Sequence, residues 1–176
     1  MTITPASPTM SQGSTQQFSA VATLSDNTTS DVTTNALWTS SSPCSITIGN
    51  SSPKTSAAPG FATAIGSGTS VTITAIYNGV QATATPVGPT GLTITPCGLN
   101  SNGHFKVGSP AQTFTASLNG SAAQGVTWVT ANSNVVTINA TTGTATFPTV
   151  GSTSISATDS SANTGQLSIT VNTDGN

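Results

Sequence analysis

The sequence predicts an all-β protein made of two tandem β-sandwich domains arranged end to end. One observation is a repeat: landmarks of the first half return in the same order in the second, and Trp128 follows Trp38 by 90 residues. The other is the regular alternation of apolar and polar residues over short segments, which is typical of half-buried strands. A repeat of this length corresponds to one small domain. We therefore predict domain 1 at residues 1–88 and domain 2 at residues 89–176.

The first half contains a series of short segments with strand periodicity. Apolar residues alternate with polar ones over residues 17–24, and further strands are expected at 36–38, 45–48, 69–77 and 80–84. The last two flank Asn78-Gly79, which is the strongest short hairpin signal because a type I′ turn needs positive φ at both central residues.

The second half repeats this series. Strands are expected at 113–118, 126–128, 135–138, 144–147, 155–157 and 167–171. The last two flank a longer turn from Ser160 to Gly165, and the two halves meet in a short Gly- and Pro-containing linker at 87–91. Short strands with frequent turn residues favour a sandwich, and the short linker favours a rod with limited bending.

Charge is scarce in this chain. Only 3% of the residues are charged, the net charge is −2, and the sequence contains neither Arg nor Glu. Without a basic cluster we expect no nucleic-acid partner. No apolar run approaches the roughly 20 residues that a membrane-spanning helix needs, so we expect no membrane insertion.

The recurring landmarks resemble the group 2 bacterial immunoglobulin-like domain over nearly the whole chain. That family's pattern has a strand ending in Thr-Pro, a Gly before a strand with an aromatic residue, a Trp strand, a Gly-Thr-Ala-Thr-like strand, a Gly, and an Ile-Thr-Ala strand. The matching residues here are Ile3–Pro5, Gly13, Phe18, Trp38, Gly60–Ala64, Gly68 and Ile73–Ala75, and then Ile94–Pro96, Gly108, Phe114, Trp128, Gly143–Thr146, Gly151 and Ile155–Ala157.

The resemblance implies an immunoglobulin-like fold and a role without catalysis. Such domains occur in intimin- and invasin-like adhesins, in other bacterial surface proteins, and on phage tails and capsids. The matched positions would form the core and the turns, with no cofactor. The core residues expected on this basis are Phe18, Trp38, Ile73, Phe114, Trp128 and Ile155.

The copies differ in two insertions. The first copy is longer at Asn50–Gly60, and the second is longer around Cys97–Phe105. Because loops on a rigid scaffold commonly carry recognition, we expect binding residues near these segments and at Leu99–Lys106. The candidates are Phe61, His104 and Phe105.

Each copy contains one cysteine, at non-equivalent positions. Cys44 follows the Trp38 strand, and Cys97 follows the Thr95-Pro96 that opens the second domain. In a sandwich both positions fall near the junction of the domains. Two interpretations stay open: a Cys44–Cys97 disulfide that locks the interdomain angle, or two separate thiols.

The residues offer little for catalysis or metal binding. His104 is the only histidine, and no acidic residue lies near it in the sequence. Asp26, Asn27 and Asp31 could offer oxygens to calcium, but local hydrogen bonds in a turn are the favoured interpretation. We therefore expect no enzyme activity, no metal and no cofactor.

The leading hypothesis is an extracellular or cell-surface module for spacing, presentation or weak adhesion to protein or glycan surfaces. The alternative is a subunit of a virion, as a phage head or tail decoration on the virion surface, or of a self-assembling filament. Met1 leads directly into Thr2-Ile3-Thr4 without a leader-like apolar segment. That start fits either a piece of a longer secreted protein or a protein that reaches the outside by assembly.

Overall fold

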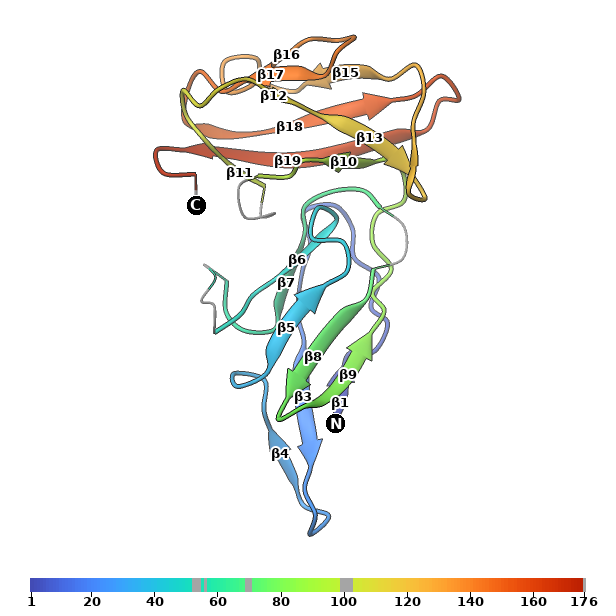
Figure 1. The fold of residues 1–176 in the computed structure, drawn as a ribbon, viewed down its shortest axis with the longest axis vertical. Coiled ribbons are helices and arrows are strands. Elements are labelled where there is room, and N and C mark those ends of the chain that lie inside the picture. The colour runs from blue at the N-terminus through green and yellow to red at the C-terminus, as the bar shows by residue number, and fades with distance from the viewer. Residues whose placement is uncertain (52–54, 56, 69–70, 99–102, 176) are drawn as a thin grey trace.

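The computed structural model describes residues 1–51, 55, 57–68, 71–98 and 103–175, and over these ranges the regular secondary structure is β-strand (Figure 1). The first sandwich comprises β1 (Thr2–Thr4), β2 (Thr15–Gln17), β3 (Ser19–Thr23), β4 (Thr29–Asp31), β5 (Leu37–Ser40), β6 (Ile46–Ile48), β7 (Phe61–Ala64), β8 (Ile73–Tyr77) and β9 (Val80–Ala84). The second comprises β10 (Thr93–Thr95), β11 (His104–Lys106), β12 (Gln112–Thr113), β13 (Thr115–Leu118), β14 (Ser121–Ala122), β15 (Thr127–Thr130), β16 (Thr137–Ile138), β17 (Thr144–Thr146), β18 (Gly151–Thr158) and β19 (Thr164–Asn172).

The two sandwiches share one topology. The first has strand orders β1-β3-β4, β2-β7-β6 and β5-β8-β9. The second repeats them as β10-β13-β14, β12-β17-β16 and β11-β19-β18-β15. Strand β11 pairs parallel with β19, and its counterpart in the first sandwich is a single parallel bridge between Thr9 and Val87. The predicted all-β, immunoglobulin-like sandwich fold is confirmed.

Each sandwich has its own hydrophobic core. In the first, Phe18 lies between β2 and β3, where the chain passes from one sheet to another, and its amide donates to the Gly60 carbonyl over 2.8 Å. Phe114 does the same in the second sandwich with the Gly143 carbonyl, at 2.9 Å. The alternation of burial expected over residues 17–24 holds from Gln17 to Thr23, with Phe18 buried completely, and it fails at Leu24, which is 47% exposed.

A glycine beside each tryptophan has a steric cause. Gly60 and Gly143 have φ values of 75° and 70°. A Cβ atom would lie 3.2 Å from Trp38 Cζ2 at Gly60, and 2.9 Å from Trp128 Cε2 at Gly143. Glycine adopts positive φ without strain and has no Cβ atom that would meet the indole ring. The recurrence of a glycine at this position in both copies therefore follows from the packing of the core.

The predicted Asn78-Gly79 hairpin is confirmed. Both residues have positive φ, at 49° and 79°, and they connect β8 to β9 with Tyr77 opposite Val80. Of the strand expected at 69–77, residues 69–70 lie outside the described part, and β8 begins at Ile73.

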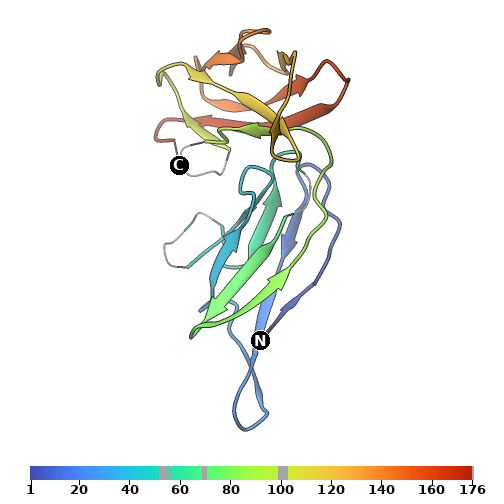
Figure 2. The ribbon, with the colours of Figure 1, turned by 45° about the vertical axis from the view of Figure 1, so that its right-hand side comes forward.

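The sandwiches follow one another along the long axis, but their strands do not run in the same direction. Figure 1 shows the strands of the second sandwich crossing the long axis, and Figure 2 shows the end of the first sandwich against the side that carries β10 and β19. The first sandwich therefore meets a strand edge of the second.

Candidate functional site at the joint between the sandwiches

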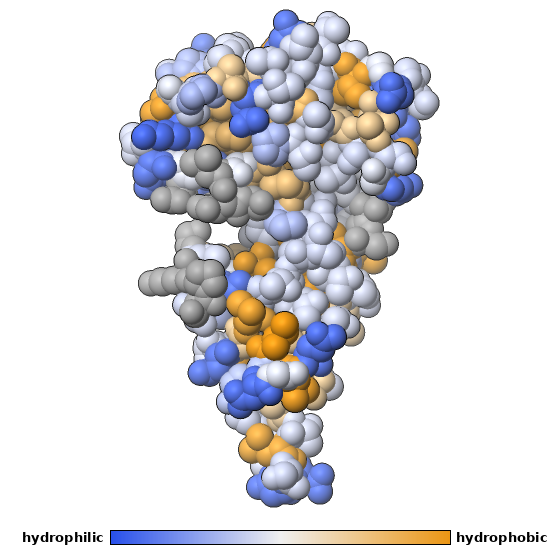
Figure 3. Space-filling view, viewed as in Figure 1, coloured by the Kyte–Doolittle hydropathy of each residue, from blue (hydrophilic) through white to orange (hydrophobic). Residues whose placement is uncertain are grey.

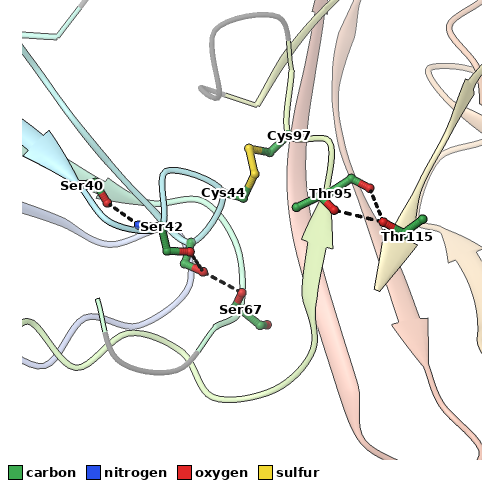
Figure 4. Close-up of a disulfide and its surroundings, with 8 residues drawn as sticks. Ser40, Ser42, Cys44, Ser67, Thr95, Cys97 and Thr115 are labelled. Carbon is green, nitrogen blue, oxygen red and sulfur yellow. Dashed lines mark hydrogen bonds between the residues drawn. A yellow bond between two sulfur atoms is a disulfide. The ribbon is translucent and has the colours of Figure 1, made fainter. Parts of the chain in front are cut away.

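A disulfide links the two sandwiches (Figure 4). It joins Cys44, in the loop between β5 and β6, to Cys97, two residues after β10, with their Cα atoms 5.2 Å apart. Cys97 is 1% exposed, and Cys44 packs partly buried against the second core. The structure thus contains the Cys44–Cys97 disulfide and not two separate thiols.

Backbone hydrogen bonds also cross the joint. Residues 65–67, which follow β7, run antiparallel to residues 166–168 of β19, with Gly66 opposite Leu167. The Ser67 amide donates to the Gln166 carbonyl over 3.0 Å, and the Ser168 amide donates to the Ile65 carbonyl over 2.8 Å. The first sandwich thus adds a short strand-like segment to the edge of the second, which is the geometry of β-augmentation.

Side chains reinforce this pairing. Ile65 is 7% exposed and belongs to the hydrophobic core of the second sandwich, although it lies in the first half of the chain. Gln12 Nε2 donates to the Ile65 carbonyl over 2.7 Å, and the Gln166 amide donates to Ser67 Oγ over 3.1 Å. The joint therefore combines apolar burial with directional hydrogen bonds.

Three serines at the joint, Ser42, Ser45 and Ser67, are linked by hydrogen bonds. Ser45 is fully buried, and its hydroxyl donates to the Ser67 carbonyl over 2.9 Å. Ser42 Oγ donates to Ser45 Oγ over 3.1 Å, beside the disulfide loop (Figure 4). A buried hydroxyl without a partner would cost free energy, so this chain of bonds holds the Cys44 loop against residues 65–67.

Small size is required where the segment passes the disulfide loop. A Cβ atom at Gly66 would collide with the Cys44 carbonyl oxygen and approach the Gln166 carbonyl oxygen at 3.4 Å. The segment can pass this close to the Cys44 loop because position 66 carries no side chain.

The six expected core residues are all buried. Phe18, Trp38 and Ile73 lie in the first core, and the other three lie in the second: Phe114, Trp128 and Ile155. Trp38 also donates its indole N–H to the Thr33 carbonyl over 2.9 Å. Their roles are those of packing residues.

The prediction that Phe105 presents itself to a partner is wrong. Phe105 lies in β11 and is 5% exposed, stacked on Phe147 with ring centroids 4.6 Å apart and edge-on to Phe114 at 5.6 Å. The sequence held a signal for this: Phe105 precedes Gly108 by the same three positions that separate buried Met10 from Gly13. The inserted residues lie before Phe105, so Phe105 itself occupies a core position.

The other two candidate binding residues are in strands. His104 opens β11, opposite Thr170, and Phe61 opens β7, opposite Gln17, and each is partly buried. Within the two inserted segments, residues 52–54, 56 and 99–102 lie outside the described part. The binding role of Phe61 and His104 stays a prediction.

Asn50, at the start of the first insertion, has a structural role. Its Oδ1 accepts from the Trp38 amide over 2.7 Å, and its Nδ2 donates to the Trp38 carbonyl over 2.6 Å. The side chain thereby takes the place of a neighbouring strand beside β5.

Sequence reasoning did not find the exposed apolar side chains. Figure 3 shows apolar residues gathered on one face of the first sandwich, over the β5-β8-β9 sheet, among hydrophilic neighbours. Leu37 of β5 and Val80 of β9 are 41% and 55% exposed, and Leu37 lies opposite partly buried Ile76. Strand periodicity alone did not show this, since it predicts which residues alternate but not which face is left uncovered.

Asp26 and Asp31 make local turns, as favoured from the sequence. Asp26 Oδ1 accepts from the Thr28 hydroxyl and amide at 2.6 and 3.0 Å, and Asp31 Oδ1 accepts from the Thr33 amide at 2.9 Å. The described residues contain no group of three or more His, Cys, Asp or Glu side chains placed to hold a metal ion.

These hydrogen bonds predict how stability depends on pH. Bonds from Thr28 lower the pKa of Asp26, those from Thr33 lower that of Asp31, and the Asn163 side chain lowers that of Asp159. A carboxyl whose folded pKa is depressed contributes stability that is fully present above its ordinary pKa of 3.8 and is lost as pH falls through the folded pKa. We expect the urea concentration at the unfolding midpoint to decrease when the pH is lowered below about 4. This decrease should be smaller in Asp159→Asn than in the wild type. A fall of equal size in Asp159→Asn and the wild type would contradict the assignment to Asp159.

The fold and joint define the class of protein: a tandem immunoglobulin-like β-sandwich protein with a cross-linked interdomain joint. No family model matches the chain. The chain is 35% identical over 179 residues to ice-binding protein 1 of Shewanella frigidimarina, an alignment that covers 96% of the chain and 19% of that protein. The chain thus spans about a fifth of the length of this curated relative.

Among solved structures, the chain is similar to a C-terminal fragment of intimin in complex with the translocated intimin receptor, with a TM-score of 0.35, 20% identity and coverage of 90% of this chain and 57% of that one. It is also similar to domains 4 and 5 of the S-layer protein SbsC, with a TM-score of 0.33, 13% identity and coverage of 88% and 80%. The group 2 bacterial subtype stays a prediction. In the described part of the chain, no helix has the length and apolar character needed to cross a membrane.

Proposed function

We propose that this chain is a non-enzymatic, surface-displayed spacing and adhesion module in which two immunoglobulin-like domains, residues 1–88 and 89–176, are held at a fixed angle. The observation that carries this proposal is the joint, where the Cys44–Cys97 disulfide and the pairing of residues 65–67 with β19 act together. Both features restrict the motion of one sandwich relative to the other, which is what a spacer that transmits position and direction requires.

The disulfide also supports the proposed location. Disulfides persist in oxidising surroundings outside the cytosol, so an extracellular or cell-surface site fits this cross-link. Solubility would then come from Ser, Thr, Asn and Gln, because only 3% of the residues are charged. The partners we propose are protein or glycan surfaces, contacted by hydroxyl and amide groups.

The relative's name raises ice binding as a second candidate. The favouring observation on this chain is the threonine-rich outer face of the β12-β17-β16 sheet, where Thr113 lies opposite Thr144 and Thr137 opposite Thr146. These hydroxyls pair with one another at 3.2 and 2.6 Å, so the face is also explained by cross-strand stabilisation. We favour spacing, because the chain matches only 19% of that protein.

Two measurements test the proposal. Spin labels at Leu24→Cys and Val150→Cys, both exposed in the wild type and one in each sandwich, report the distance between the sandwiches by pulsed electron resonance. We expect one narrow distance distribution, and a broad one would contradict a spacer.

The second measurement is the amount of protein that slowly growing ice incorporates. Retention of the chain in the ice would replace spacing by ice binding as its function, whereas exclusion from the ice supports spacing.

A further inference from the structure

The chain just beyond β9 in the first sandwich, residues 85–87, pairs with that sandwich's own N-terminal segment. The Thr85 amide, one residue beyond β9, donates to the Ala6 carbonyl over 2.8 Å, and the Val87 amide donates to the Pro8 carbonyl over 2.9 Å. A parallel bridge between Thr9 and Val87 follows. This continuation of the β9 edge is therefore paired within the first sandwich.

The second sandwich begins to repeat this arrangement. Because Ile73 pairs with Ala84 and Ile155 pairs with Leu167, Ala84 and Leu167 are equivalent positions. Counting onward, Thr170 is the counterpart of Val87, and its amide donates to the Gly103 carbonyl over 2.8 Å, as Val87 donates to Pro8. The bridge of His104 with Thr170 then matches that of Thr9 with Val87.

The equivalence fails at one position on the edge. Ser168 is the counterpart of Thr85, but its amide donates to Ile65 of the first sandwich at 2.8 Å. The position that Ala6 fills in the first sandwich is thus filled, in the second, by a residue from the other sandwich. The second copy carries its insertion at this point, between Cys97 and Phe105, and Cys97 is bonded to Cys44.

The filling segment supplies more than a carbonyl group. Ile65 places its side chain in the second core. The Ser67 backbone amide donates to the Gln166 carbonyl, and the Ser67 hydroxyl accepts from the Gln166 backbone amide. Gly66 lets the backbone pass the Cys44 carbonyl. The edge of β19 at residues 166–168 therefore pairs with an extended segment in which one large apolar residue is followed by two small residues.

We infer that Ile65–Ser67 is a donor segment that completes the second sandwich, so the stability of the second sandwich depends on a residue of the first. This inference rests on the joint and is independent of surface display or spacing. It makes the two copies unequal: the first pairs residues 85–87 within itself, whereas the second pairs residues 170–172 within itself and takes the partner of Ser168 from the first.

The test uses the full chain and its two tryptophans, one in each core. Trp38→Phe leaves Trp128 to report the second sandwich, and Trp128→Phe leaves Trp38 to report the first. In each background we compare Ile65→Ala with Ile48→Ala, a matched control because Ile48 is partly buried against the first core. We expect Ile65→Ala to lower the urea midpoint reported by Trp128 more than that reported by Trp38, and Ile48→Ala to do the reverse.

A milder variant keeps the inference testable if Ile65→Ala does not fold. Ser67→Ala removes the hydroxyl that accepts from the Gln166 amide, and we expect hydrogen exchange at that amide to become several-fold to about tenfold faster. Two results would overturn the inference: an Ile65→Ala effect confined to the Trp38 signal, or Gln166 exchange unchanged in Ser67→Ala.

Discussion

Replacement of Trp38 by alanine is expected to lower the free energy of unfolding by about 3–5 kcal/mol, the usual cost of removing a large buried aromatic side chain. Trp38 is 1% exposed, it donates its indole N–H to the Thr33 carbonyl, and Gly60 lies against its ring. Because small domains have only about 5–15 kcal/mol of stability in total, this loss should leave the first sandwich marginally folded. Urea unfolding followed by circular dichroism measures it.

The neighbouring residue provides the control. Leu37 precedes Trp38 on the same strand and is 41% exposed, so Leu37→Ala should change the free energy of unfolding by no more than about 0.5–1 kcal/mol. Equal effects of Leu37→Ala and Trp38→Ala would show that Trp38 does not have the packing role that we assign to it.

Removal of the interdomain disulfide should have an effect of similar size. Its cysteines are 53 residues apart, and the chain-entropy model gives about 4 kcal/mol of stabilisation for a loop of this length. We expect Cys44→Ala with Cys97→Ala to lose about 2–4 kcal/mol, the range typical of native disulfides. Alanine is preferred to serine because Cys97 is buried, and a hydroxyl there would need a partner.

The wild-type protein supplies the check on this variant. Denatured without reductant it should show no free thiol, and after reduction it should show two. The reduced wild type should then unfold at nearly the same urea concentration as the double alanine variant. Two free thiols before reduction would mean that the native protein lacks this cross-link.

The sequence predicted the repeated parts of the molecule well, because repetition exposes what the fold requires. Phe18, Trp38 and Gly60 recur as Phe114, Trp128 and Gly143, and in both sandwiches the glycine lies against the phenylalanine carbonyl group and the indole ring. The Asn78-Gly79 hairpin was equally predictable, since its turn depends on local conformational preferences.

The parts that differ between the copies were harder to predict. Phe105 lies at the end of the insertion, where the sequence alone favours a recognition loop, although its spacing to Gly108 matches that of Met10 to Gly13. Ile65 gave no sequence signal of its role, because a single apolar residue after a strand does not show which of two cores it enters. Only the position of one sandwich against the other decides this.

The most direct test of a fixed joint is the rotational diffusion of the two sandwiches, measured by backbone ¹⁵N relaxation on the oxidised chain. If the disulfide and the pairing of Ile65–Ser67 with β19 hold the sandwiches together, the amides of β1–β9 and β10–β19 should fit one common diffusion tensor. Separate tensors with different correlation times for the two sandwiches would contradict a fixed joint.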